Sequence, residues 1–216
     1  MTKGTLHLLA SISLFIGIAL LPASTAGREG PMSPIASFVA TIYWARADAA
    51  FDEGRLEVGL ARAEQALKLD PEPPEGWSWL ASVLVHRFGA PEFEETAEGR
   101  RAWAEAGLAV LARGESKTSE PQELAFHAGL ILAFIGSLPL EVYEWPGGER
   151  AIWLAASDHF ERAKSLGHPR ADAASQSALR ELHWPSPEVE GGSSGEGGPS
   201  GPIHIDHTHD YDVLGD

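Results

Sequence analysis

Apolar residues recur at helical spacing along most of the chain, and no stretch shows the strict alternation that predicts a strand. Leu56, Leu60, Ala63 and Leu67 share one helical face, and the charged residues of that segment lie elsewhere. The same spacing continues to residue 184. It predicts seven helices, at residues 35–52, 56–69, 76–87, 93–113, 121–135, 149–166 and 170–182. The pattern therefore predicts an all-α domain over residues 35–184.

Proline follows a polar residue at three places along this domain: Asp70-Pro71, Glu120-Pro121 and His168-Pro169. Each pair follows one predicted helix and precedes another, because proline cannot continue a helix and disfavours helical geometry at the residue before it. The prolines are 50 and 48 residues apart. This period indicates an internal repeat of helix pairs.

Small and large residues recur around these boundaries at matching spacings. They are Ala47 and Gly54 in the first pair, Ala66, Leu69, Asp70 and Pro71 at its end, Trp77, Leu80, Ala81 and Leu84 in the next helix, and Ala156, Phe160, Ala163 and Leu166 further on. In these positions the chain resembles the tetratricopeptide repeat (TPR) family, which stacks antiparallel helix pairs of 34 residues. The resemblance implies a TPR-like helical-hairpin solenoid, whose concave groove holds an extended peptide or a partner helix, and no catalytic chemistry.

The repeats depart from that family in length and composition. The second and third units are about 15 residues longer than the family's repeat, with the excess near residues 88–93 and 137–148. We therefore expect an irregular solenoid in which the two insertions project from one edge. Some members of the family clamp a C-terminal carboxylate with lysines and asparagines, whereas this chain has no asparagine and few lysines. It is therefore not expected to bind acidic C-terminal peptides in that way.

The first 26 residues follow the order of a secretory signal: Lys3, an apolar run over residues 6–21, and small residues ending at Ala26. One interpretation is a signal peptide that is cleaved after Ala26. The other is a helix that anchors the chain in a membrane through residues 5–26, although a span needs about 20 apolar residues. Either one predicts an exported protein of the bacterial envelope, periplasmic or anchored in the inner membrane.

Charge and composition narrow the possible partners. The chain has 16 Lys and Arg against 31 Asp and Glu, which gives a formal charge of −15. That excess argues against a nucleic-acid partner, which needs a basic surface, and leaves apolar or basic protein partners. The chain has no cysteine, so disulfides, thiolate metal sites and cysteine nucleophiles are excluded.

Three aromatic residues are candidates for binding a partner. Trp79 lies about 200° around the helix from Trp77, so the two cannot face the same neighbour. Trp79 is therefore expected in the groove or beneath the insertion at Phe88. Trp145 lies in a predicted loop, where a tryptophan needs a pocket or a partner. The remaining tryptophans of the helices are expected to pack between them: Trp44, Trp103 and Trp153.

The pattern favours neither an enzyme nor a bound cofactor. His86, His127 and His159 each stand alone on a predicted helix, and Glu94 and its acidic neighbours predict a solvated helix face. The zinc motif HExxH and the phosphate-binding motif GxxxxGKS/T are absent from the sequence. A GxSxG match at residues 191–195 falls in a glycine-rich stretch instead of between a strand and a helix. The protein is therefore expected to be non-catalytic.

Residues 185–216 form a predicted disordered tail that begins with a stretch rich in glycine, serine, proline and glutamate. It ends in a segment whose candidate metal ligands are His204, His207, His209, Asp206 and Asp210. Imidazole and carboxylate groups bind zinc, nickel or copper, and these spacings allow a weak, exposed site. A solvated acidic terminus is the alternative.

The sequence thus predicts a non-catalytic protein-interaction scaffold or assembly factor of the bacterial cell envelope. The alternative is an envelope metal-handling protein that binds a divalent ion through residues 185–216. Removal of the tail distinguishes the two, because only the second function depends on it.

Overall fold

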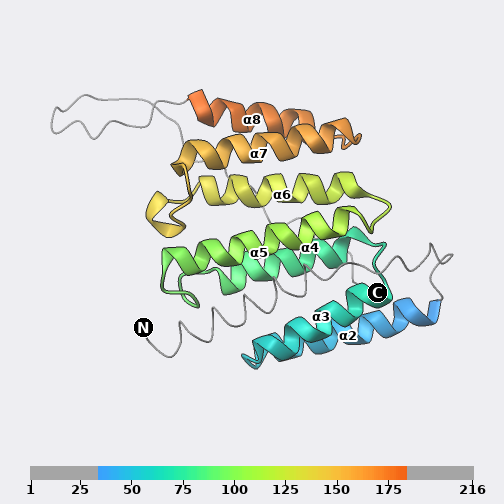
Figure 1. The fold of residues 1–216 in the computed structure, drawn as a ribbon. Coiled ribbons are helices and arrows are strands. Elements are labelled where there is room, and N and C mark those ends of the chain that lie inside the picture. Colours follow the sequence, from blue (N-terminus) through green and yellow to red (C-terminus); the bar gives the residue numbers. More distant parts are fainter. Residues whose placement is uncertain (1–33, 184–216) are drawn as a thin grey trace, which may run out of the picture. The chain divides into compact units, whose positions relative to one another are not determined.

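The computed structural model describes residues 34–183, which form helices joined by turns and loops. No strand occurs in this part of the chain, so the prediction of an all-α domain is confirmed there. The α-helices, shown in Figure 1, are α2 (Pro34–Asp52), α3 (Leu56–Leu69), α4 (Pro74–Ser82), α5 (Ala97–Glu115), α6 (Pro121–Gly136), α7 (Gly148–Ser165) and α8 (Ala171–His183). A π-helix, η1 (Val83–Phe88), extends α4, and a 3-10 helix, η2 (Leu140–Val142), precedes α7.

Several predicted features lie outside the described residues. They are the signal or anchor at residues 1–26, Trp184, and the tail at residues 185–216 with its candidate metal ligands. These stay predictions. Between residues 34 and 183, no helix has both the length and the apolar character that a membrane crossing requires.

The helix boundaries match the predicted ones in the first pair and depart from them in the second. α3 occupies the predicted residues 56–69. The helix predicted over residues 76–87 begins earlier, at Pro74, where the missing amide hydrogen of proline costs no helical hydrogen bond. It then changes from α to π geometry at Val83. The spacing of apolar residues therefore located this helix but did not reveal the change of geometry.

The start of α5 corrects two expectations. The helix predicted from residue 93 begins only at Ala97, because the Thr96 hydroxyl caps it by accepting a hydrogen bond from the Gly99 amide at 3.0 Å. Glu94, expected on a solvated face, is almost buried. Its carboxylate accepts hydrogen bonds from the amide and the hydroxyl of Thr96 at 3.1 and 2.7 Å. This carboxylate orders the turn before the helix instead of facing water.

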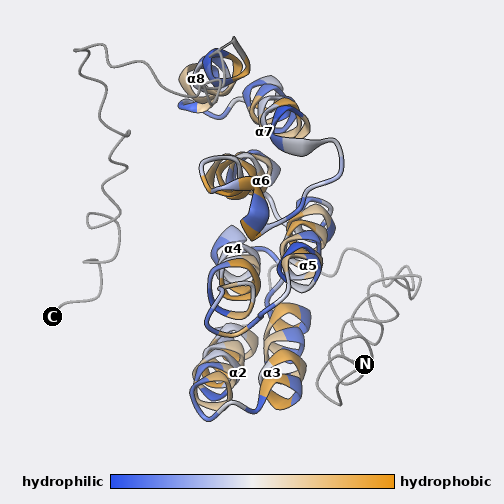
Figure 2. Ribbon diagram, turned by 90° about the vertical axis from the view of Figure 1, so that its left-hand side faces the viewer, coloured by the Kyte–Doolittle hydropathy of each residue, from blue (hydrophilic) through white to orange (hydrophobic). Residues whose placement is uncertain are grey.

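Each helix packs against the next one along the chain, and alternate helices lie in two layers. Figure 2 shows α2, α4, α6 and α8 in one layer and α3, α5 and α7 in the other. The connections are mostly short, so successive helices run in opposite directions. α4 and α6 also contact each other directly, so neighbouring pairs meet within one layer.

A tryptophan closes the boundary at Asp70-Pro71. The indole N–H of Trp77 donates a hydrogen bond to the Pro71 carbonyl at 2.8 Å, and the Arg113 guanidinium lies 5.1 Å from the centre of the ring. Gly114 of α5 lies directly against the same ring, where a side chain would collide with it. Trp77 is therefore buried between α4, α5 and the turn that precedes α4.

Aromatic rings join the first helix pair to the second. Trp44 of α2 meets Trp79 of α4 edge to face, with ring centres 5.1 Å apart. Phe51, at the end of α2, lies 6.0 Å from Trp79 and 5.4 Å from Phe88. Edge-to-face and tilted ring pairs of this kind add stability beyond the area they bury. The first pair is thus attached mainly through ring contacts.

The two insertions in the repeat pattern lie against each other at one edge of the helices. Arg100 of α5 is almost buried and donates hydrogen bonds to the carbonyl of Glu94 at 2.7 Å and to the carbonyl of Val142. The Tyr143 hydroxyl donates to the Gly89 carbonyl at 3.3 Å. The insertions therefore do not project separately. Arg100 and Tyr143 donate hydrogen bonds to backbone carbonyls of both and hold them together.

Candidate functional site

A band of partly exposed side chains crosses α2, α4, η1 and α6, which lie in the same layer (Figure 2). We call it the aromatic–histidine band, and its members are Trp44, Trp79, Ser82, His86, His127, Leu130 and Phe134. Three of them follow each other at i, i+3 and i+7 on α4–η1, and three do so on α6. That spacing places each set of three along one side of its helix.

Two contacts bring the two rows together. The Ser82 hydroxyl lies 3.0 Å from Nε2 of His127. The His86 ring meets the Phe134 ring edge to face, with ring centres 4.5 Å apart. Leu130, between these contacts on α6, is 40% exposed. The band therefore combines exposed apolar surface with one hydrogen-bonding pair.

The hydrogen-bonding pair is uncharged at neutral pH. Burial, and to a lesser extent the neighbouring charge of His86, lowers the pKa of His127 to about 4. An imidazole without a proton on one nitrogen can accept a hydrogen bond or donate one, depending on its tautomer. The band can therefore bind uncharged polar groups of a partner without placing a buried positive charge beside them.

The same pair has the two residue types of a serine–histidine catalytic dyad, but its properties do not suit that role. A general base works best when its pKa lies near the operating pH, and the pKa of His127 lies well below neutrality. In a catalytic triad a third group orients the base, and among the hydrogen bonds of residues 34–183 none reaches Nδ1 of His127. The pair therefore differs from a serine–histidine catalytic dyad in the pKa of its histidine and, among the described residues, in the lack of a third group that orients it.

The π-helix η1 carries one end of the band. π-Helical turns are rare and occur often at functional sites. The hydroxyl of Tyr143 lies 3.5 Å from the Val85 carbonyl and 3.3 Å from the Gly89 carbonyl, so it supplies a donor where the helix ends. The insertion at residues 137–148 therefore supports the segment that presents His86.

Comparison with models of protein families, with curated proteins and with solved structures finds no match for this chain. What the protein does must therefore be inferred from its sequence pattern and from the geometry of residues 34–183.

The three aromatic residues predicted to bind a partner occupy different surroundings. Trp79 is partly buried, and it belongs to the band. Phe88 is only 7% exposed and packs among Phe51 and two further rings, so it drops out of the candidate surface. Trp145 is half-buried against the core in the loop before α7. The structure therefore does not gather the three into one site.

Sequence reasoning missed most of the band. The sequence pattern presents His86 and His127 as isolated helical histidines and assigns no role to Leu130 and Phe134. The available signal was the spacing of His127, Leu130 and Phe134 along α6, together with the apolar character of almost every other residue in that helix. Because α6 is apolar on most sides, the row formed by His127, Leu130 and Phe134 indicates a functional face and not a solvated one.

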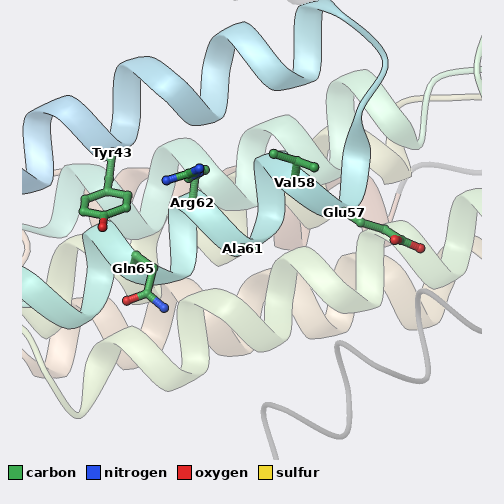
Figure 3. Close-up of a pocket in the computed structure, with 6 residues that line it drawn as sticks. All are labelled: Tyr43, Glu57, Val58, Ala61, Arg62 and Gln65. Atoms are coloured by element: carbon green, nitrogen blue, oxygen red, sulfur yellow. The ribbon is translucent and has the colours of Figure 1, made fainter.

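Two shallow, open depressions lie elsewhere on the surface. The first, drawn in Figure 3, is lined by Tyr43 of α2 and by Glu57, Val58, Ala61, Arg62 and Gln65 of α3. The Arg62 guanidinium lies 5.7 Å from the centre of the Tyr43 ring and so fills part of it. The second lies along α7 beside His159, whose pKa is lowered by burial and whose Nδ1 is buried without a hydrogen-bond partner. Neither is deep enough to enclose a ligand.

The described residues contain no group of three or more His, Cys, Asp or Glu arranged to hold a metal ion. The predicted ligands lie outside them: His204, His207, His209, Asp206 and Asp210. A zinc, nickel or copper site in the tail therefore stays a prediction.

Proposed function

We propose that the protein is a non-catalytic binding scaffold, in which TPR-like helix pairs present the aromatic–histidine band to a segment of a partner protein. The observation that carries this proposal is the band itself: it spans three helices of one layer and leaves Leu130 exposed between a histidine and a phenylalanine.

The burial of small residues supports the repeat interpretation. Ala47, Ala66, Ala81, Ala156 and Ala163 occupy positions that carry the resemblance, and each is 0% exposed. An alanine at such a position lets the backbones of two helices approach closely. Alternate helices also fall into one layer, which is the arrangement that gives a repeat protein a continuous binding face (Figure 2).

The chemistry of the band and the charge of the chain define the partner. Leu130 and the neighbouring rings favour apolar side chains, in the manner of an amphipathic helix or an extended peptide that anchors through every third or fourth residue. The formal charge of −15 favours a basic or neutral segment over an acidic one. We place the protein in the bacterial cell envelope because of the apolar segment at residues 6–21.

Affinity purification of three variants from the native host tests the proposal. Leu130→Glu introduces a charge into the band, and Leu154→Glu introduces the same charge on α7, where Leu154 is 44% exposed. The third variant lacks residues 185–216. We expect at least one protein that wild type and Leu154→Glu recover equally, that Leu130→Glu loses by about tenfold, and that survives deletion of the tail. A tenfold loss corresponds to about 1.4 kcal/mol.

The outcomes separate the two functions considered from the sequence. A partner that is lost only with the tail, and whose recovery depends on added zinc or copper, would support metal handling and contradict the proposal. Equal recovery by all three variants would show that neither the band nor the tail binds the partner.

A further inference from the structure

The outer face of α2 carries an apolar stripe. Ile35, Phe38, Ile42, Ala45 and Ala49 are all exposed, and they follow each other at alternating steps of three and four residues. Phe38 is 67% exposed and Ile42 is 38% exposed. This is the a/d spacing with which one helix packs along another in a coiled coil.

The stripe lies opposite the side by which α2 joins the rest of the protein. Ala40, Ala47 and Phe51 are buried against the neighbouring helices, and Ile42 lies about 200° around the helix from Ala40. α2 is the first helix of the described stack (Figure 1). The end of a helical repeat array normally turns a polar face to water, so an apolar outer face needs a cover.

The distribution of large and small residues along the stripe indicates what packs against it. Bulky Ile35 and Phe38 occupy the N-terminal half of the stripe, and small Ala45 and Ala49 occupy the C-terminal half, with Ile42 between them. When two copies of this helix pack antiparallel with Ile42 on the two-fold axis, the bulky half of each faces the small half of the other. A two-fold interface requires this self-complementarity.

We propose that α2 is a homodimerisation helix, through which two copies of this chain pair antiparallel along the stripe. The charges on the helix favour the same arrangement. Residues 34–45 carry no charge, and the first turn of α2 has no acidic residue to complement its dipole. In the antiparallel pair, the exposed Asp48 of each copy lies beside the first turn of the other copy's α2, where a negative charge is stabilising, and the exposed Arg46 lies opposite residue 38, beyond that turn.

Two other occupants are less suited to the stripe. The apolar segment at residues 6–21 of the same chain is the expected signal or anchor, and either fate removes it from α2. An anionic membrane surface is repelled by a chain with a formal charge of −15. Neither occupant accounts for the opposed large and small halves, whereas a second copy does.

The dimer is expected to be reversible. α2 has 19 residues, so its full length is about 28 Å. One helix pair of that length buries less than the roughly 1,200–2,000 Å² of a standard stable interface. The mass of the wild-type chain should therefore move between one and two copies of 23.1 kDa as its concentration rises through the micromolar range.

Single cysteines test the pairing, because the full-length chain contains none. Under mild oxidation, Ile42→Cys should give a disulfide-linked dimer, since residues on the axis come within the 4.4–6.8 Å that a disulfide needs between Cα atoms. Phe38→Cys should not link to itself, because the two copies of residue 38 are about 12 Å apart along the axis. An equimolar mixture of Phe38→Cys and Ala45→Cys should link. Leu154→Cys on α7 is the control for random collision.

The pattern of cross-links decides between arrangements. Linking of both Ile42→Cys and Phe38→Cys would indicate parallel helices and overturn the antiparallel proposal. Linking of Leu154→Cys as strongly as Ile42→Cys, or no linking above that control, would overturn dimerisation through α2. The inference does not rest on the proposed function, since none of these substitutions lies in the aromatic–histidine band.

A measurement without cysteine complements the test. Light scattering of Ile42→Asp should show one copy at concentrations where wild type shows two, with an unchanged helical circular dichroism spectrum. The proposal would be contradicted by a wild-type chain that stays monomeric up to about 10 µM, above the micromolar range in which the dimer is expected. That result would hold even if the variant failed to fold.

Discussion

The outer faces of the helices at the two ends of the described stack, α2 and α8, differ in polarity. At the first end, the outer face of α2 is apolar, with Phe38 and Ile42 exposed. At the other end, the outer face of α8 carries Asp172, Gln176 and Arg180 and is mainly polar. A polar terminal face lets a helical array end in water. The difference indicates that the α8 end is built to face solvent and that the α2 end is built to be covered.

Two ion pairs, one near each end, differ in the same sense. Near the first end, Glu64 of α3 pairs with Arg113 of α5, and their side chains are only 11% and 22% exposed. At the second end, Lys164 of α7 pairs with Asp172 of α8, and their side chains are 46% and 56% exposed. Buried pairs cost a great deal to break, whereas exposed pairs contribute little. The contact between α3 and α5 therefore includes a largely buried ion pair beside the ring contacts of α2, whereas the Lys164–Asp172 pair between α7 and α8 is exposed.

Breaking the buried pair should have the largest effect. Arg113→Ala leaves the Glu64 carboxylate buried without its partner, a change that costs about 3–5 kcal/mol in the free energy of unfolding. We expect the lower end of that range, because part of the pair stays exposed. Urea unfolding followed by tryptophan fluorescence measures the loss.

A double variant is the control for that result. Glu64→Leu combined with Arg113→Met removes both charges and should recover most of the lost stability. If the double variant is as unstable as Arg113→Ala, the cation over the Trp77 ring, and not the ion pair, holds this end in place.

Acid should weaken the middle of the stack, between the two ends. The pKa of His127 is lowered to about 4 by burial, whereas an unfolded histidine titrates near 6.5. Between these values the unfolded chain binds a proton that the folded chain does not, so stability falls as the pH falls. The loss should be about 2 kcal/mol between about pH 7.5 and about pH 5.

His127→Gln isolates that effect, because glutamine keeps a polar group near Ser82 and does not titrate. The free energy of unfolding of the variant should change less over the same pH range, by about the 2 kcal/mol assigned to His127. Parallel curves for variant and wild type would show that His127 is not the source of the acid sensitivity.

A glycine where α6 meets α7 should be intolerant of a side chain. A Cβ on Gly129 of α6 would lie 2.5 Å from the Phe160 ring of α7. Overpacking costs about 1–3 kcal/mol, and the better helix propensity of alanine offsets up to about 1 kcal/mol of that. Gly129→Ala should therefore lose about 1–2 kcal/mol in urea unfolding. A variant as stable as wild type would mean that α7 moves away from α6 freely.

The smallest effect should come from the exposed pair at the second end. The hydrogen bond and the charge of Lys164 lower the pKa of Asp172, so any contribution of the pair exists above the ordinary pKa of a carboxyl group and is lost in acid. Asp172→Asn should leave the urea midpoint at neutral pH indistinguishable from that of wild type. A loss of unfolding free energy as large as that of Arg113→Ala would show that the exposed pair matters as much as the buried one, and would contradict the comparison.

The helices could be predicted from the sequence because their signals are local. The 3.6-residue spacing and the proline boundaries located the seven α-helices between residues 34 and 183, α3 to the residue, but not the short 3-10 helix η2. The predictions failed where individual side-chain hydrogen bonds, near or distant in the chain, decide local geometry. Thr96 and Glu94 delay the start of α5, and Tyr143 bonds the carbonyls where η1 ends.

The candidate site could be predicted only in part. Trp79 becomes a candidate from the sequence because two tryptophans on one helix cannot face the same neighbour, and its binding role stays a prediction; its place beside the row that holds His127 is not visible in the sequence. Ser82 and His127 are 45 residues apart in the chain, and no pattern within either helix shows that they meet. Phe88 is predicted at the surface but lies in the core, because an aromatic residue beside an insertion can point into the core or out of it with the same spacing.

Site-specific photocrosslinking in the native host tests the binding role of the band most directly. A photoreactive amino acid replaces Leu130 in the band in one strain and Leu154 on α7 in another, since both residues are exposed to a similar extent. The proposed function predicts a discrete adduct with one protein from position 130 and none from position 154. No adduct from position 130, or the same adducts from both positions, would contradict it.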